Sequence, residues 1–325
     1  MNISVIATNL NGARFLPRLI ESLKNQAGVR TEIIVVDRES VDDSREVLRG
    51  FPEVKVLSET PRSGLVTGYC VGLQAATSDL LFFCNEDMWL DPQCLQRLAA
   101  EVSLERRIGA ADPWQWTYDE KTLIHGGTRF VESRWQPNSP HPRRTFNFTV
   151  PLVHGDLVPF PCAGAFLIHR DVYNDIGGWD TSFFLNQEDI DLFLRAWRKG
   201  WRCVTVPGAK VYHAVGASKG QFRGGGSDVA ERCYIGTRSN VAVIGLKYFS
   251  LPAISWSFAG LFAPLIAHLL KFRWKELRLD LKTLILTLRR FPQVWRFRRS
   301  TRIVRSSSPG EQFFSRPEFS VQRER

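Results

Sequence analysis

Three acidic clusters and one histidine carry the side chains that metal binding and acid–base catalysis need. Asp37 ends the apolar run EIIVVD, and residues 85–87 (Asn-Glu-Asp) directly follow the run DLLFFC. Residues 187–191 (Gln-Glu-Asp-Ile-Asp) open a helical pattern, and His213 follows a strand-like run. One or two carboxylates beside substrate phosphates can bind a hard divalent cation, and a further carboxylate can take a proton from a bound hydroxyl. These clusters therefore indicate a metal site and a catalytic base.

Each of these residues also has a purely structural interpretation. Asp37 is followed by Ser40 and Asp42, which are typical of turns and of helix N-termini. Residues 85–87 could form an ordinary strand-to-helix turn. The acids within 188–191 favour the positive end of a helix dipole, although three acids in four residues exceed what capping requires. A lone histidine is more often structural than a metal ligand, so both interpretations stay open at this point.

The sequence lacks the motifs of several other enzyme classes. It has no G-x-S-x-G nucleophile elbow and no Walker loop, and residues 9–12 (Asn-Leu-Asn-Gly) stand where a dinucleotide fold would have G-x-G-x-x-G. A dehydrogenase or a kinase is therefore poorly supported. The six cysteines contain no C-x-x-C pair, which argues against a zinc site and against a secreted disulfide framework.

The elements that must position these residues alternate between strand and helix near the N-terminus. Short apolar runs typical of buried parallel strands cover 3–7, 32–37, 54–57 and 79–84. Helical patterns lie between and after them, at 15–23, 66–76 and 92–102. A doubly wound α/β fold with a mostly parallel, Rossmann-like sheet satisfies this order. Such sheets bind ligands at the carboxyl ends of their strands, where Asp37 and Asp87 fall.

The middle of the chain has a weaker pattern. Residues 112–160 are rich in Pro, Gly, Trp and His without a sustained period, which predicts long loops and short strands. A strand is expected at 166–168, and Ile190, Phe193, Leu194 and Trp197 predict one apolar face of a helix over 188–199. A strand, CVTVP, follows that helix. The Gly-rich stretch 216–227 is expected to be a mobile loop.

The last quarter of the chain is apolar and then strongly basic. Residues 248–270 contain no Lys, Arg, Asp or Glu, which is long enough for a membrane span. Pro252 and Pro264 interrupt this run, and spanning would carry the basic segment after it across the bilayer, against the positive-inside tendency. These features argue against a transmembrane helix, and three alternatives stay open for 248–270: it spans the membrane, lies on it or packs away from it.

Residues 271–305 contain twelve Lys or Arg and two acids, a local net charge of +10 that equals the net charge of the whole chain. Because this charge lies apart from the acidic candidates for a cleft, nucleic acid is not an expected partner. Apolar residues recur here at spacings of three and four, which predicts a basic amphipathic helix on an anionic membrane surface: Trp274, Leu277, Leu281, Leu284, Leu288 and Phe291. The alternative is a helical hairpin packed on the rest of the chain.

Five segments, taken in chain order, resemble the motifs of family 2 glycosyltransferases, especially the bacterial branch with rhamnosyl- and galactofuranosyltransferases. The resemblance runs from about Ile3 to Ser218. It departs from the family pattern at Arg38, at Tyr69 and at Asn85, which replaces the first Asp of a D-x-D metal motif. The segments are NLNGARFLPRLIESL, VVDRESVDDS, CNEDMWLDP, FPCAGAFLIHRDVYNDIGGWDTSFFLNQEDIDLFLRAWRKGW and VPGAKVYHAVGAS.

The resemblance implies a GT-A fold and an inverting transferase. It would move a sugar from a nucleoside diphosphate sugar to a hydroxyl of a saccharide or lipid-linked saccharide, with Mn²⁺ or Mg²⁺, in the synthesis of cell-surface polysaccharide or glycolipid. Displacement of a nucleoside diphosphate leaves charge on phosphate, which a divalent cation neutralises. The alternatives are a membrane-associated, non-catalytic scaffold that binds nucleotide sugars, or a nucleotidyltransferase, whose glycine- and lysine-rich phosphate loop is missing here.

The resemblance also assigns roles to residues. Asp189 would be the catalytic base, Asp87 and His213 would bind the metal, and Asp37 would contact the base of the nucleotide. Trp179, Glu188 and Asp191 would either contact the acceptor or support the residues that do. The donor nucleotide would be bound by Asp37 together with Thr8, Asn9, Asn11, Asn85 and Glu86.

Three regions are expected along the chain. Residues 1–240 would form the catalytic domain, with a nucleotide-sugar half at about 1–110 and an acceptor half at about 111–240. Residues 241–305 would be a helical membrane-association region, and 306–325 a disordered tail. The N-terminus has no basic n-region or cleavage site, so we expect a cytoplasmic protein, peripheral on the inner face of the cytoplasmic membrane.

Overall fold

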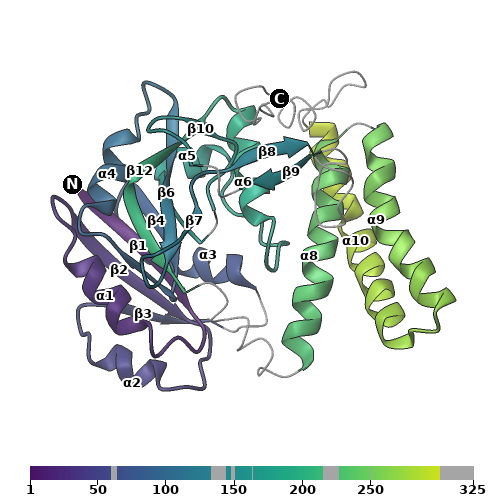
Figure 1. Ribbon diagram of the computed structural model, residues 1–325, viewed down its shortest axis with the longest axis horizontal. Coiled ribbons are helices and arrows are strands. Elements are labelled where there is room, and N and C mark those ends of the chain that lie inside the picture. Colours follow the sequence, from purple (N-terminus) through teal and green to yellow (C-terminus); the bar gives the residue numbers. More distant parts are fainter. Residues whose placement is uncertain are drawn as a thin grey trace.

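A mixed ten-stranded sheet forms the centre of the protein (Figure 1). Its strand order is β10-β12-β6-β11-β4-β1-β2-β3, with β5 paired to β12 and β7 paired to β6. The structure is a computed structural model. It describes the backbone of residues 1–59, 64–132, 144–147, 151–162, 164–214, 227–249 and 251–300.

The N-terminal half of the sheet is parallel, as the apolar runs predict. In its register, Asn9 pairs with Asp37 and Thr8 pairs with Asn85, so three strand ends lie at one edge. The strands are β1 (Asn2–Asn9), β2 (Arg30–Asp37), β3 (Lys55–Ser58) and β4 (Leu80–Asn85). The helices of this half are α1 (Leu16–Lys24), α2 (Ser44–Arg49), α3 (Leu65–Ala75) and α4 (Cys94–Glu101).

The second half of the sheet contains the short strands expected over residues 112–160 and one long strand that was not expected there. A ten-residue strand, β6 (Ile108–Thr117), lies in the sheet between β12 (Arg202–His213) and β11 (Ala165–His169). Pro113 argues against a strand in the sequence, because proline lacks the N–H that a sheet needs. The sheet accommodates Pro113 at a register shift in β12 between Val206 and Lys210. The shorter strands are β5 (Met88–Leu90), β7 (Leu123–His125), β10 (Leu157–Val158) and the separate pair β8 (Arg129–Glu132) and β9 (Arg144–Asn147).

Two helices follow β11: α5 (Arg170–Asp175) and α6 (Glu188–Arg198). The apolar face predicted for α6 is confirmed, because Ile190, Phe193 and Trp197 are at most 6% exposed. Trp197 also donates its indole N–H to the carbonyl oxygen of Pro159, at 2.9 Å. This packing fixes which way the residues at the start of α6 can face.

Three helices form a layer beside α6: α8 (Ser227–Tyr248), α9 (Leu251–Leu270) and α10 (Trp274–Ser300) (Figure 1). Gln293 of α10 donates to both carboxylate oxygens of Asp180, each at 3.1 Å, and Lys247 of α8 pairs with Asp180 at 3.2 Å. The helices are therefore packed on the rest of the chain. This packing matches the alternative given in the sequence analysis, in which the C-terminal segment forms a helical hairpin against the catalytic domain. The expected boundary at 240–241 falls inside α8.

Among the described helices, none combines the length and the apolar character that crossing a membrane requires. The expected disordered tail at 306–325 lies outside the described residues, as does nearly all of the Gly-rich stretch 216–227.

Candidate active site

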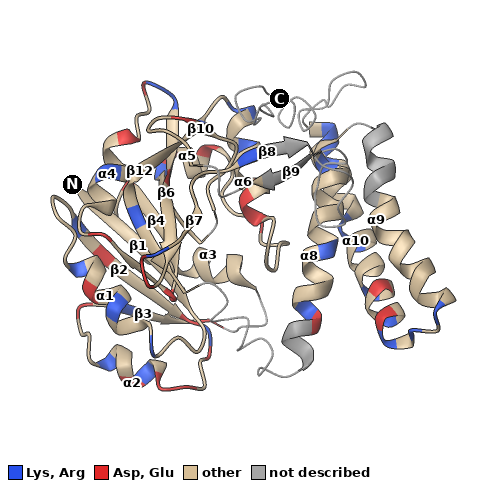
Figure 2. Ribbon diagram, in the orientation of Figure 1, with Lys and Arg blue, Asp and Glu red and all other residues tan. Residues whose placement is uncertain are grey.

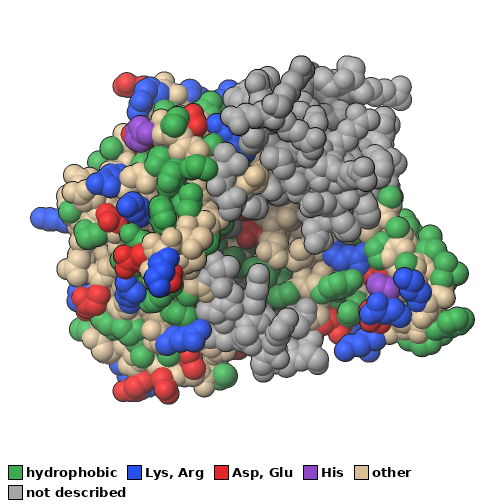
Figure 3. Space-filling view, in the orientation of Figure 1, with side chains coloured by type: hydrophobic (Ala, Val, Ile, Leu, Met, Phe, Trp, Pro, Cys, Tyr) green, Lys and Arg blue, Asp and Glu red, His purple; other side chains and the backbone are tan. Residues whose placement is uncertain are grey.

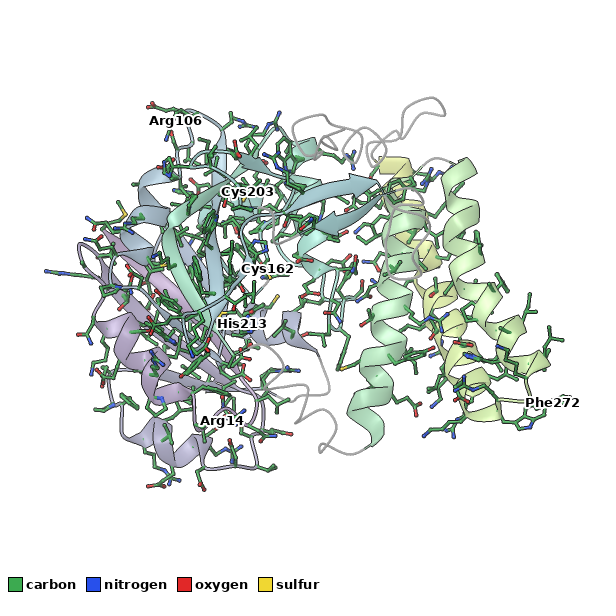
Figure 4. All side chains as sticks on the ribbon, in the orientation of Figure 1. Arg14, Arg106, Cys162, Cys203, His213 and Phe272 are labelled. Atoms are coloured by element: carbon green, nitrogen blue, oxygen red, sulfur yellow. The ribbon has the colours of Figure 1, made fainter. Side chains whose placement is uncertain are left out.

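A pocket of about 300 Å³ joins the carboxyl end of β4 to the start of α6 and the end of β12. Figure 4 places His213 and Cys162, which both line it, near the middle of the molecule and far from Phe272 at the tip of the helical layer. Four residues predicted for the site line the pocket together: Asn85, Glu188, Asp189 and His213. The lining also includes Leu65, Phe160, Cys162, Gly164, Leu185, Asn186, Gln187 and Ile190.

Asp87 and His213, the two predicted metal ligands, lie together. The Nε2 atom of His213 is 3.2 Å from Oδ1 of Asp87. Backbone pairing holds them there, because His213 pairs with Met88 across β5 and β12, and the N–H of Ala214 donates to the carbonyl oxygen of Asp87. No third His, Cys, Asp or Glu completes a metal cluster among the described residues.

The second ring nitrogen of His213 has a partner that suits metal binding. Its Nδ1 atom lies 3.2 Å from the side-chain oxygen of Gln115 on β6. A proton on Nδ1 donated to this oxygen leaves the lone pair of Nε2 directed at the Asp87 side, as in many metal sites. The donor set of one carboxylate and one imidazole therefore fits a divalent cation whose other ligands come from substrate.

The loops after β1 and β2 are tied together by a side-chain network. Asn9 donates to Oδ1 of Asp37 at 2.9 Å and to the hydroxyl of Ser40 at 3.0 Å. Asn11 accepts from the N–H of Val41 at 2.8 Å. The Asp37 side chain is 1% exposed, and its Oδ2 atom pairs with Nε of Arg45 at 3.3 Å. These contacts place Asn9, Asn11 and Asp37 in one rigid group at the strand edge.

Asn85 is oriented by a residue that the sequence interpretation treated only as a departure from the family pattern. Tyr69 of α3 is fully buried and donates its hydroxyl to Oδ1 of Asn85 at 3.0 Å. Thr8, directly across from Asn85 in the sheet, contributes a side-chain hydrogen bond to the same Tyr69. Burial raises the pKa of Tyr69 well above its ordinary value, so it stays a hydrogen-bond donor.

Glu86 packs against the loop after β1. A Cβ atom added to Gly12 would lie 2.4 Å from Cγ of Glu86, so only glycine permits this close approach. Burial, followed by the charge of Asp87, raises the pKa of Glu86 to about 8.

Glu188 and Asp189 present two adjacent carboxyl groups to the pocket. Glu188 is 3% exposed, and its Oε2 atom has no hydrogen-bond partner among the described residues. Burial, followed by the neighbouring charge of Asp189, raises the pKa of Glu188 to about 8. Asp189 is half-buried, and its Oδ1 accepts from the N–H of Ile190 at 2.8 Å. At neutral pH the pair therefore holds a proton on Glu188.

Two residues expected near the acceptor do not line the pocket. Asp191 is fully buried, with Lys247 2.6 Å from Oδ1 and Arg195 2.9 Å from Oδ2. Trp179 is 6% exposed and stacks on Tyr69, with 5.7 Å between ring centroids. Helix α8 covers Asp191 and an aromatic cluster surrounds Trp179, so both lie behind the residues that line the pocket. Their role at the acceptor or in support of it stays a prediction.

Two residues at the site were not singled out from the sequence: Cys162, which lines the pocket, and Gln115, which contacts His213. Gln115 lies in β6, the strand that was not predicted. The pairing of β6 with β12 brings its side chain to His213. Burial raises the pKa of the Cys162 thiol to about 12, so this cysteine stays protonated and does not act as a nucleophile.

The sequence of residues 4–177, slightly more than half of the chain, matches the family model described as glycosyl transferase family 2. The chain belongs to glycosyltransferase family 2. It is 26% identical over 216 residues to the uncharacterized glycosyltransferase YwdF of Bacillus subtilis, covering 66% of this chain and 74% of that protein. It is 23% identical over 246 residues to the N-acetylglucosaminyl-diphospho-decaprenol L-rhamnosyltransferase of Mycobacterium tuberculosis, covering 67% of this chain and 78% of that enzyme.

Solved glycosyltransferase structures confirm the expected GT-A fold. GalNAc-T7 with UDP, GalNAc and Mn²⁺ superposes with a TM-score of 0.53 at 20% identity, covering 65% of this chain and 43% of that one. The mannosyltransferase PcManGT of Pyrobaculum calidifontis, with GDP-Man and Mn²⁺, gives a TM-score of 0.51 at 15% identity, covering 88% and 86%. This glycosyltransferase therefore shares its fold with both enzymes.

The raised pKa of Glu188 predicts a pH-dependent effect of Glu188→Gln on stability. Unfolding lets Glu188 lose its proton at a pKa near 4.5 instead of about 8, so the wild type loses stability as pH rises between these values. Glu188→Gln cannot lose a proton. Its Tm should equal that of the wild type at low pH and exceed it above pH 8 by at least about 2 °C, the equivalent of roughly 1 kcal/mol.

Thermal unfolding of both proteins across this pH range measures the effect. Glu105→Gln, at an exposed surface site, is the matched control and should show no such divergence. A Tm difference for Glu188→Gln that stays constant with pH would contradict the raised pKa.

Proposed function

We propose that this glycosyltransferase inverts the anomeric centre while moving a sugar from a nucleoside diphosphate sugar to a hydroxyl of a saccharide or lipid-linked saccharide. The observation that carries the proposal is one pocket that brings His213, with its partner Asp87, together with Glu188 and Asp189. Asp87 and His213 are suited to binding a cation at the leaving diphosphate. Glu188 and Asp189 are suited to accepting the proton of the attacking hydroxyl. The rhamnosyltransferase relative supports a role in cell-surface polysaccharide or glycolipid synthesis.

The donor side of the pocket would bind the nucleotide through the strand-edge group. Asn9, Asn11 and Asp37 are already rigidly connected, and Thr8, Asn85 and Glu86 lie at the neighbouring strand ends. Asp87 and His213 would hold Mn²⁺ or Mg²⁺, which neutralises charge on the leaving diphosphate. The neighbours solved with UDP or GDP-Man and with Mn²⁺ support this class of donor and metal.

Asp189 is the proposed catalytic base. Two adjacent carboxyl groups in a buried site do not readily ionise together, and the environment of Glu188 keeps the proton there. Asp189 is the more exposed of the two and so is the carboxylate left to accept a proton from the acceptor hydroxyl. The buried face of α6 holds it in fixed geometry, which proton abstraction requires.

Replacement of Asp189 by Asn is expected to abolish transfer while leaving binding intact. The variant should fold, bind donor with unchanged affinity, and lose turnover by roughly 10²- to 10⁴-fold, the usual contribution of a general base. Transfer assays with a panel of nucleotide sugars and acceptors measure this. Asp171→Asn, in the first turn of α5, is the control for the loss of a helix-dipole interaction and should keep its activity.

If Asp189→Asn retains more than about a tenth of wild-type turnover, the base is another group, because a general base contributes far more. Glu188 would then be the remaining carboxylate of the pocket, since Asp191 is buried in ion pairs. A wild-type protein that neither hydrolyses donor nor transfers sugar with Mn²⁺ would indicate the non-catalytic scaffold instead.

Replacement of Asp87 by Ala should remove the metal dependence of donor binding. The wild type is expected to bind its nucleotide sugar more tightly with Mn²⁺ than with a chelator, since Asp87 and His213 bring the cation to the diphosphate. Calorimetry on the wild type, Asp87→Ala and the exposed-site control Asp119→Ala measures this dependence. An unchanged Mn²⁺ dependence in Asp87→Ala would contradict the assignment.

The surface of α10 supports membrane attachment as part of the same proposal. The face of α10 that packs on α8 is largely polar and includes Asp280, Thr283, Thr287 and Arg290. Its outer face is apolar instead, with five side chains that are 44% to 53% exposed: Leu281, Ile285, Leu288, Phe291 and Trp295.

Basic residues lie along the apolar outer face of α10. Arg278, Arg289 and Arg296 are exposed beside it. Figure 3 shows hydrophobic and basic side chains together at the lower end of the helical layer, the part that is visible in this view. An apolar stripe between arginines is typical of helices that lie on anionic membranes. This surface supports the proposal that the enzyme is cytoplasmic and peripheral on the inner face of the cytoplasmic membrane.

A charge placed in this stripe should weaken membrane binding. Leu288→Glu inserts a carboxylate at the centre of the stripe, which disfavours burial in lipid and repels an anionic surface. Co-sedimentation with phosphatidylglycerol vesicles should drop sharply relative to the wild type, while Val153→Glu, at another exposed apolar residue, should pellet like the wild type. Equal, negligible pelleting of all three proteins would contradict membrane attachment.

A further inference from the structure

The segment just before α6 has an unusual backbone. Asn186 and Gln187 both have positive φ, 65° and 69°, although neither is glycine. Residues with a Cβ atom adopt this left-handed conformation only at a cost in free energy, so neighbouring contacts must maintain it. Gln187 immediately precedes Glu188 and Asp189, and the direction in which these carboxyl groups enter the pocket depends on it.

Helix α8 supplies the contacts that maintain this conformation. Asn240, which is 1% exposed, donates its amide to the carbonyl oxygens of Leu185 at 3.0 Å and Asn186 at 2.8 Å. One turn earlier in α8, the hydroxyl of Thr237 accepts from the side chain of Asn186 at 2.8 Å. Figure 2 shows the acidic start of α6 beside α8. Three hydrogen bonds from one helix therefore hold the strained turn.

Helix α10 in turn fixes the orientation of the Asn240 amide. Arg290, 6% exposed, donates to Oδ1 of Asn240 at 2.6 Å and to the hydroxyl of Ser182 at 2.9 Å. Its guanidinium also lies 4.6 Å from the ring centroid of Phe183. A guanidinium can only donate hydrogen bonds, so it must face the oxygen of the amide. The nitrogen of Asn240 is thereby directed at the two carbonyl groups.

We propose that Asn240 is a positioning residue for glycosyl transfer, holding the turn at Asn186 and Gln187 so that Glu188 and Asp189 face the bound acceptor. The proposal rests on the proposed function for its kinetic consequence. Asn240 touches no reacting atom in this scheme; it acts through the backbone of residues 185–187. In this proposal the helical layer positions catalytic groups, in addition to its proposed role in membrane attachment.

The decisive variant is Asn240→Asp. It has the same shape and keeps an oxygen for Arg290, so the contact between α8 and α10 remains. The second carboxylate oxygen of Asp at this position cannot donate a hydrogen bond. It would instead repel the carbonyl oxygens of Leu185 and Asn186. Asn240→Ala removes the two donors without adding charge, which separates the lost hydrogen bonds from the new carboxylate. Thr287→Val is the matched control, because Thr287 bonds Ser239 between α8 and α10 but makes no hydrogen bond to residues 185–187 within the described part of the chain.

Both Asn240 variants should lower kcat about 10- to 100-fold, the effect of displacing a catalytic group by roughly an ångström, while donor KM stays near the wild-type value. Thr287→Val should retain wild-type kcat at a similar loss of Tm. Equal kcat values for the Asn240 variants and the wild type, or an equal loss in Thr287→Val, would overturn the proposal.

A second measurement does not depend on activity. Amide hydrogen exchange of the peptide spanning 184–190 should accelerate in both Asn240 variants and not in Thr287→Val. If the wild type proves inactive, the proposed function fails, and this exchange measurement still decides whether Asn240 holds the turn. Unchanged exchange in the Asn240 variants would overturn the positioning role even if transfer is observed.

Discussion

The structure depends on a charge cluster buried between α6 and α8. Burial alone would raise the pKa of Asp191, but the charges of Lys247 and Arg195 outweigh it and hold that pKa well below its ordinary range. The hydroxyl of Tyr248 adds a further bond, 2.7 Å from Oδ1. Loss of one partner from such a pair leaves an uncompensated buried charge and costs about 3–5 kcal/mol. The sheet region and the helical layer therefore stabilise each other.

Sequence patterns predicted the parts of the fold in which one side-chain period dominates. The parallel strands are largely apolar runs, and the apolar face predicted for α6 is buried in the structure. The strand β6 was not predicted because Asp112 and Pro113 interrupt its apolar pattern. Both residues are accommodated by contacts outside their own segment. Asp112 bonds His125 at 2.9 Å, and Pro113 lies where the register of β12 shifts.

The candidate site was predictable where a motif lies in one stretch of chain. Asp87, His213, Glu188 and Asp189 stand out from neighbours in sequence, and the fold brings three strand and helix ends together. The residues that orient the site were not predicted. Gln115 contacts His213 and Tyr69 bonds Asn85, and neither contact follows from a local sequence pattern. The burial of Asp191 was not predictable for a similar reason, since its motif gives no sign that α8 covers it.

The outer face of α10 has a consequence for the behaviour of the protein in solution. Where no lipid is present, exposed Leu281, Leu288 and Trp295 favour contact between copies, while Arg278, Arg289 and Arg296 on each copy repel those of the next. Added salt screens that repulsion over a Debye length of about 10 Å at 0.1 M and leaves the apolar attraction in place. Colloidal stability of the purified protein should therefore decline as ionic strength rises, which is the opposite of salting-in.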